Sequence, residues 1–136
     1  MILRRLYDDK LAQASYFIAC QESGTALIVD PVRDVDRYIA LASEEKVRIT
    51  DATETHIHAD FVSGARDLAR ETGARLHLSD MGGSDWKYDG IDKQTDMLRD
   101  GSSFMVGRVR IDVLHTPGHT PEHVTFLVTD CATANA

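Results

Sequence analysis

Two short segments carry five of the six histidines in the chain, and the spacing of these histidines suggests metal binding. The first segment, THIHADF, has His56, His58 and Asp60 at every second position. Alternate side chains of an extended segment point to the same side, so we expect these three groups to share one face at the end of a strand. Neutral imidazoles with a carboxylate are ligands that suit zinc, iron or nickel at neutral pH.

The second segment, HTPGHTPEH, places His115, His119 and His123 four residues apart. Two prolines and a glycine exclude a regular helix there, so this spacing is not one face of a helix. A loop stiffened by prolines can hold His119 rigidly toward a site, whereas His115 and His123 fit equally well as outer partners of ligands or as structural hydrogen bonders. The two segments together predict a metal site built from His56, His58 and His119.

Other chemistry finds little support in the chain. His77 lies in the apolar stretch ARLHL, where we expect a structural, hydrogen-bonded histidine. A GxSxG elbow is absent, which argues against serine-hydrolase chemistry, and no Walker or Rossmann glycine pattern is present.

Length and composition bound the class of protein. The 136 residues are 43% hydrophobic and 27% charged with a net charge of −7, as in an ordinary globular protein. An acidic chain is a poor match for nucleic acid, and no apolar run approaches the roughly 20 residues that span a bilayer. Cys20 and Cys131 form no CxxC pair, which favours a reducing compartment. We expect one domain over residues 1–136, located in the cytoplasm, with neither a nucleic-acid nor a membrane partner.

The apolar periodicity predicts helices between strands early in the chain and successive strands later. Helices are expected around residues 35–42 and 62–72, the first capped by Asp34 and the second ended by Gly73. Residues 79–95 are rich in Gly, Asp and Ser and are predicted to form a long loop or lid. This order favours an α/β sandwich over a doubly wound sheet. The predicted strands are 2–7, 15–20, 25–30, 47–52, 74–78, 97–99, 103–106, 109–115 and 123–129.

The two histidine motifs together resemble those of the metallo-β-lactamase superfamily, whose signature is HxHxDH with a further histidine downstream. The stretches ETHIHADFVSGARDLA, LSDMGGSDWKY and VLHTPGHTPEHVTFLVTD look like the persulfide dioxygenase and glyoxalase II-like branch, as in members fused to a rhodanese domain. The resemblance implies the first half of an αββα sandwich, a mixed and mostly antiparallel sheet with helices. It matches His56, His58 and His119 to the family's first metal site, and Asp60 to the aspartate of the second, which we expect to serve in catalysis.

Phe61 stands where dinuclear members of the family carry a histidine of the second metal site. Because a phenyl ring is no ligand, the resemblance favours one metal per protomer, with iron(II) as the first choice and zinc as the alternative. Iron(II) held by histidines and a carboxylate leaves positions for O₂ and a persulfide. The implied activity is oxidation of glutathione persulfide or a related thiol persulfide, with sulfite and glutathione as products. One histidine of the HxH pair can stay off the iron in such dioxygenases, so His56 and His58 need not be equal ligands.

Two alternatives stay open: a zinc thioester hydrolase of the glyoxalase II type, and a non-catalytic, truncated module that self-associates. The family's last first-site ligand is an aspartate in a later strand, and Asp130 is a candidate for it that precedes the expected position. We expect the domain to be truncated before that ligand. The missing part would come from the remainder of a longer chain, such as one with a rhodanese domain, or from pairing in a homo-oligomer.

Overall fold

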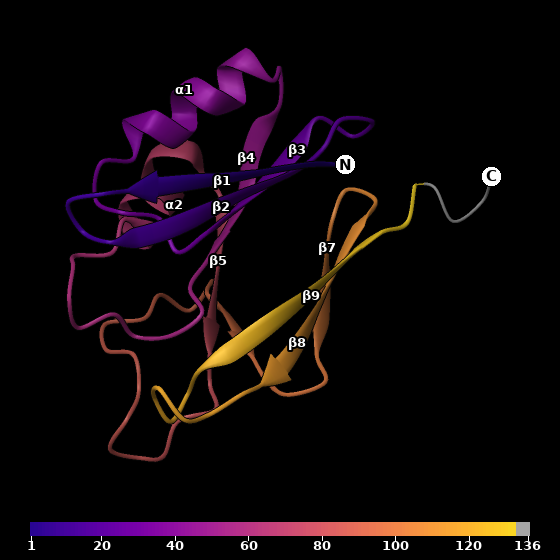
Figure 1. Ribbon diagram of the computed structural model, residues 1–136. Coiled ribbons are helices and arrows are strands. Elements are labelled where there is room, and N and C mark those ends of the chain that lie inside the picture. Colours follow the sequence, from indigo (N-terminus) through magenta and orange to yellow (C-terminus); the bar gives the residue numbers. More distant parts are fainter. Residues whose placement is uncertain (133–136) are drawn as a thin grey trace.

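The chain forms three layers in a computed structural model that describes residues 1–132: a layer of helices, a six-stranded sheet and a three-stranded sheet (Figure 1). The helices α1 (Asp36–Glu44) and α2 (Ala65–Thr72) cover one face of the larger sheet, and the smaller sheet covers the other. This is the predicted first half of an αββα sandwich.

The strand order in both sheets follows the sequence. The first three strands pair antiparallel, whereas the third to sixth pair parallel, and the smaller sheet is antiparallel throughout. Four of the seven pairings in the described part of the chain are therefore antiparallel, which agrees with the predicted mixed arrangement. The larger sheet consists of β1 (Ile2–Asp8), β2 (Gln13–Cys20), β3 (Thr25–Val29), β4 (Arg48–Thr53), β5 (Arg75–Ser79) and β6 (Asp96–Leu98), and the smaller of β7 (Ser103–Val106), β8 (Val109–His115) and β9 (Val124–Asp130).

Apolar side chains on both faces of the central strands hold the layers together. In β2 and β3, Phe17 and Ile28 pack toward the helices, whereas Ile18 and Leu27 pack toward the smaller sheet. In the smaller sheet, Val109 and Ile111 of β8 face Ile18 and Leu27 across the interface between the two sheets and are fully buried. Burial on both faces explains why these strands are nearly continuous apolar runs, as strands covered on both sides usually are.

The predicted helix around residues 35–42 is present, but its predicted cap is wrong. The N-cap residue of α1 is Val35, which has no side-chain capping bond. The Asp34 carboxylate instead pairs with Arg37, at 3.3 Å. Tyr38 anchors the helix: its hydroxyl accepts the Val32 N–H at 2.9 Å and lies 2.6 Å from the Ser15 hydroxyl. These two contacts of the buried Tyr38, with Ser15 of β2 and with Val32 ahead of the helix, fix where α1 begins.

Helix α2 follows the histidine motif and starts later than predicted. It begins at Ala65, and Val62, expected on its apolar face, lies outside it and is exposed. Gly73 ends the helix in the left-handed conformation, with φ of 74°, as predicted. Gly64 joins the motif to the helix, and its N–H donates to the Pro31 carbonyl at 2.8 Å.

His77 is structural, as predicted. Its ring is 1% exposed and stacks on Phe104 of the opposite sheet, with centroids 4.0 Å apart. Nε2 lies 2.8 Å from the Asp51 carboxylate, and Nδ1 lies 3.2 Å from that of Asp96. The side chain thus joins β4, β5 and β6 to the smaller sheet.

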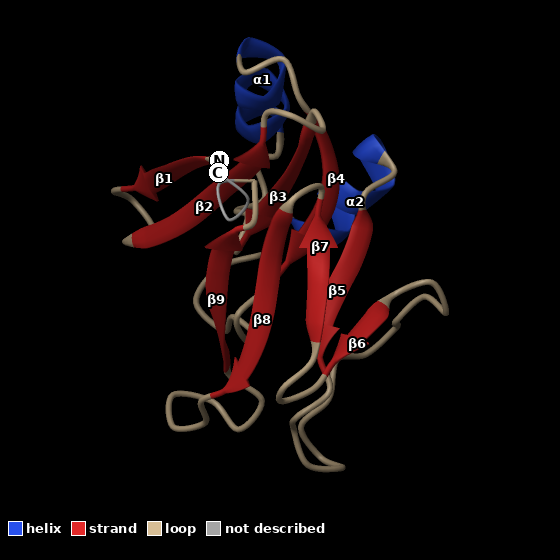
Figure 2. Cartoon of the chain, turned by 90° about the vertical axis from the view of Figure 1, so that its right-hand side faces the viewer, coloured by secondary structure: helices blue, strands red, loops and turns tan. Residues whose placement is uncertain are grey.

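The outer face of the smaller sheet is uncovered by any helix of the described chain (Figure 2). It exposes Met105, Leu114 and Leu127 among polar neighbours, so the exposed apolar surface there is interrupted rather than continuous. Separately, neither helix within residues 1–132 is long and apolar enough to cross a membrane.

Gly64 offers a test of how tightly the motif is seated. A Cβ at this position would overlap the Val32 carbonyl and lie 2.9 Å from Cγ1 of Val35. We expect Gly64→Ala to lower the free energy of unfolding by about 3 kcal/mol, because backbone must move. Gly73→Ala meets no atom within 4 Å but keeps a positive φ, so it should cost only about 1 kcal/mol. Equal costs in urea unfolding would contradict the close approach of Val32 to Gly64.

Candidate metal centre

The histidine segments meet at the carboxyl ends of β3 and β4. Strand β4 ends at Thr53, and the chain then leaves the sheet and carries the motif across its edge. The start of β9 is bound to this segment, because the Val124 N–H donates to the Thr55 carbonyl at 2.9 Å. One main-chain hydrogen bond thus joins two motifs that are about sixty residues apart in the sequence.

The predicted strand alternation of His56, His58 and Asp60 is wrong in its reasoning, because residues 54–60 are not in a strand. The two histidines nevertheless lie together, with ring centroids 4.1 Å apart. Asp60 is exposed and forms no hydrogen bond or ion pair with the described residues, although its charge acts on His58. The proposed catalytic role of Asp60 stays a prediction without a contact to support it.

Four imidazoles form the cluster, with His56 at its centre. Centroids of His119 and His123 lie 4.7 Å and 5.1 Å from that of His56. His123, which the sequence left undecided, therefore belongs to the cluster, and its Nδ1 lies 3.0 Å from the Thr116 hydroxyl. His115 is structural: its Nε2 lies 2.8 Å from the Pro121 carbonyl and closes the proline loop.

The cluster fits a metal ion in its donor chemistry. Imidazole nitrogen binds a metal such as zinc at about 2 Å, which puts the centroids of two ligating rings roughly 5 Å apart on a tetrahedral ion. The separations of His56 from His119 and His123, 4.7 Å and 5.1 Å, are close to this value, whereas the 4.1 Å from His56 to His58 is shorter. Among residues 1–132, however, no three donor side chains already converge as a ligand set.

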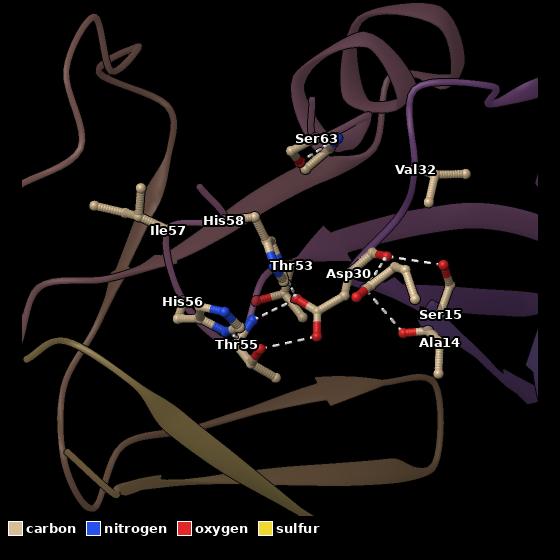
Figure 3. Close-up of polar contacts among 12 residues, drawn as sticks. Ala14, Ser15, Asp30, Val32, Thr53, Thr55, His56, Ile57, His58 and Ser63 are labelled. Atoms are coloured by element: carbon tan, nitrogen blue, oxygen red, sulfur yellow. Dashed lines mark hydrogen bonds and ion pairs between the residues drawn. The ribbon is translucent and has the colours of Figure 1, made fainter. Parts of the chain in front are cut away.

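Asp30 is the residue that organises the cluster, and the sequence patterns did not identify it (Figure 3). This buried carboxylate accepts the Thr55 N–H at 2.7 Å and the Thr55 hydroxyl at 2.8 Å. It also lies 2.9 Å from Nε2 of His58. A signal was available: Asp30 ends one strand and the motif follows another, and the carboxyl ends of neighbouring parallel strands meet at one edge.

The two motif histidines differ in protonation. Burial, followed by the nearby His58, lowers the pKa of His56 to about 4, so His56 is neutral at pH 7. Burial alone would lower the pKa of His58 too, but the hydrogen bond and charge of Asp30 outweigh burial and raise it. Nδ1 of His56 lies 2.8 Å from the Thr55 hydroxyl. At neutral pH the neutral ring of His56 therefore keeps a nitrogen lone pair, whereas His58 is drawn toward an ion pair.

Three further polar side chains surround the cluster: the buried Glu54 and Glu122, and the half-buried Tyr88, whose hydroxyl is enclosed. Burial raises the pKa of Glu54, and burial with the charges of Glu54 and Glu122 raises that of Tyr88. One oxygen of each carboxylate and the tyrosine hydroxyl are enclosed without a hydrogen-bond partner in the described residues. All three lie in stretches that carry the family resemblance, but residue type and spacing there indicated the histidines and not these side chains.

Two other residues bear on the metal count. The Phe61 ring lies 4.4 Å from that of His58, so an apolar side chain occupies the flank of the cluster. Asp130 is at the opposite end of β9 from Val124, six residues or about 20 Å along the strand. It pairs there with the N-terminal amine at 3.0 Å. Asp130 therefore cannot reach the histidines.

A separate groove of about 940 Å³ runs beside α2 and residues 90–96. No histidine lines it. This groove is therefore separate from the candidate metal centre.

Comparison with known families identifies the fold class. The family model described as the metallo-beta-lactamase superfamily matches residues 8–131. The chain belongs to the metallo-β-lactamase superfamily. The resemblance inferred from the two histidine motifs is therefore confirmed.

Individual relatives divide between two chemistries. A mitochondrial persulfide dioxygenase, ETHE1 of Bos taurus, is 31% identical over 135 residues, which are 96% of this chain and 49% of that protein. A hydroxyacylglutathione hydrolase of Nitrosococcus oceani is 38% identical over 111 residues, 81% of this chain and 40% of that protein. The chain spans about half the length of the curated relatives it matches.

Solved structures agree on the fold. A crystal structure of a metallo-beta-lactamase from Staphylococcus aureus superposes with a TM-score of 0.93 at 45% identity, covering 96% of this chain and 39% of that one. The ETHE1 structure from Myxococcus xanthus gives 0.81 at 29% identity, covering 94% and 54%. These likenesses support the family and metal binding, without distinguishing iron from zinc.

The depressed pKa of His56 predicts an acid-sensitive fold in the metal-free protein. Between about pH 6.5 and about pH 4 the unfolded state binds a proton at His56 that the folded state does not. The free energy of unfolding therefore decreases as the pH is lowered through this range. His58 has the opposite effect, because its pKa is raised in the folded state. It stabilises the fold at pH values below its ordinary pKa, and this contribution is lost as the pH rises through its pKa in the folded state. We expect His56→Gln to reduce the acid loss measured by urea unfolding. An unchanged loss, equal to that of a His115→Gln control, would reject this origin.

Proposed function

We propose that the chain supplies the metal-binding half of a mononuclear iron(II) persulfide dioxygenase acting on glutathione persulfide. The observation that carries this proposal is Phe61, whose ring flanks His58 at 4.4 Å where a second-site histidine would stand in dinuclear relatives. A phenyl ring cannot replace that ligand, so one metal is favoured over two. The ETHE1 relatives add support at about 30% identity.

His56 and His119 are the proposed ligands from this part of the chain. Burial keeps His56 unprotonated at neutral pH, so its lone pair is available without loss of a proton. His58, assigned as a third ligand from the sequence, is held by Asp30 through Nε2. We therefore propose that His58 supports the site from beside it and that a carboxylate from outside the described residues completes the set.

The proposed reaction joins glutathione persulfide, O₂ and water to give glutathione and sulfurous acid, which ionises to sulfite. The outer sulfur is oxidised, O₂ is reduced, and the sulfur–sulfur bond breaks with a proton passing to the glutathione thiol. A bound iron(II) would supply the site at which persulfide and O₂ meet. In this chain, the Asp30 carboxylate provides a negative charge beside the imidazole of His58. The Phe61 ring keeps one flank of the site apolar.

A second candidate is a zinc thioester hydrolase of the glyoxalase II type. It is favoured by the hydroxyacylglutathione hydrolase of Nitrosococcus oceani, which is 38% identical in the matched region. Either activity would require the remaining half of the fold, from a longer chain, such as one with a rhodanese domain, or from self-association. We also propose a cytoplasmic location, because the two cysteines form no CxxC pair and favour a reducing compartment. The third alternative, a non-catalytic self-associating module, predicts no metal at all.

Elemental analysis of protein purified without added metal separates the three. We expect about one iron per chain, and O₂ uptake with glutathione persulfide in the natural full-length protein. His56→Ala and His119→Ala should each weaken metal binding more than about 100-fold, since even outer partners of ligands cost about 10–100-fold. His115→Ala, which alters a structural histidine outside the cluster, is the matched control.

Other results point elsewhere. Two zinc ions per chain with thioester hydrolysis and no O₂ uptake would replace the dioxygenase by the hydrolase. A metal-free dimer whose stability is indifferent to chelator and to His56→Ala would establish the non-catalytic module.

A further inference from the structure

Glu122 is a buried acid with no cationic partner. It lies between His119 and His123 and is 1% exposed. No Lys, Arg or His among residues 1–132 forms an ion pair with it. Burial of an unpaired carboxylate is costly. A residue kept at such a position needs a specific partner.

That partner is the main chain between the two motif histidines. Oε1 of Glu122 accepts the N–H of Ile57 at 2.6 Å. The bond needs one acceptor oxygen at this reach, which a carboxylate or a side-chain amide of the same length can supply. Because Ile57 lies between His56 and His58, this bond fixes the backbone that carries both rings relative to the loop that carries His119.

Glu122 also contacts the end of β5 and the long loop over residues 80–95 that follows it. Its carbonyl accepts the Ser79 hydroxyl at 2.6 Å, and the same hydroxyl accepts the Met81 N–H at 3.2 Å. A Cβ at Gly82 would lie 3.4 Å from Cβ of Glu122, so the loop packs directly on this residue. Oε2 and the hydroxyl of Tyr88 from the same loop are both enclosed and without a hydrogen-bond partner in the described residues. Glu122 therefore touches the histidine motif, the end of β5 and the loop at once.

We propose that Glu122 is a positioning residue that sets the geometry of the two histidine segments and couples it to the 80–95 loop. The coupling to metal rests on the proposed function, in which His56 and His119 bind an ion. The bond to Ile57 is independent of that assumption. The role depends on the reach and the acceptor oxygen of the side chain and not on its charge.

Two substitutions separate reach from charge. Glu122→Gln keeps the length and an acceptor oxygen for Ile57 but removes the charge. Glu122→Asp keeps the charge but is one methylene too short. Glu122→Ala removes both. Glu71→Ala, an exposed acid on α2, is the matched control. The probe is Co²⁺, whose affinity is measured by competition and by its visible absorption, together with amide hydrogen exchange of Ile57 in the metal-free full chain.

We expect Glu122→Asp and Glu122→Ala to weaken Co²⁺ binding about tenfold or more and to speed exchange at Ile57. Glu122→Gln and Glu71→Ala should match the wild type in both measurements. If Glu122→Ala fails to fold, the Gln and Asp pair still decides.

The opposite results would overturn the proposal. If Glu122→Asp binds Co²⁺ like the wild type and Glu122→Gln binds it more weakly, the charge matters and not the reach. If amide exchange at Ile57 is unchanged in Glu122→Asp and Glu122→Ala, the bond does not hold the segment. If no variant and not even the wild type binds Co²⁺, the proposed function fails. The Ile57 exchange then decides the positioning role by itself, since it needs no metal.

Discussion

The carboxylate of Asp30 is the constraint on which the histidine cluster depends. It binds the backbone and hydroxyl of Thr55 and the ring of His58, and its own main chain is fixed as well. The Asp30 N–H donates to the Thr53 carbonyl at 2.9 Å, and its carbonyl accepts the Ser15 hydroxyl at 2.8 Å. With φ of 52°, Asp30 adopts a left-handed conformation that aspartate tolerates better than most residues. The surrounding bonds keep it there.

This arrangement is possible because β3 and β4 are parallel neighbours. Their carboxyl ends meet at one edge, so a strand-ending aspartate can reach the segment that follows the next strand. Helix α1 supplies the crossover between them, with Tyr38 bonded to Ser15 and Val32 on either side of Asp30. The apolar layers on both faces of the sheet therefore do more than stabilise the chain. They also fix the position of Asp30 relative to Thr55 and His58.

The fold was largely predictable, and the site was predictable only in part. Strand and helix order follows from apolar periodicity, since both faces of β2 and β3 are buried and α2 ends at a left-handed glycine. The motif histidines were identified by type and spacing. Their grouping was predicted for the wrong reason, because residues 54–60 are not a strand. Glu122 and Glu54 were missed, because burial and an enclosed oxygen without a partner in the described residues are properties of tertiary structure. The Ile57 N–H that Glu122 binds is 65 residues away in the sequence.

The pair of histidines in HxH shows how far the structure changes the meaning of a motif. In the sequence His56 and His58 are equivalent donors. In the folded chain His56 is surrounded by three imidazoles, which with burial keep it neutral, while His58 is bound to Asp30 and covered by Phe61. A cation would compete with Asp30 for Nε2 of His58. At His56, Nδ1 lies 2.8 Å from the Thr55 hydroxyl, but Nε2 has no hydrogen-bond partner in the described residues. The asymmetry follows from one buried carboxylate on one side, and it favours a site in which only the first histidine of the motif faces the metal.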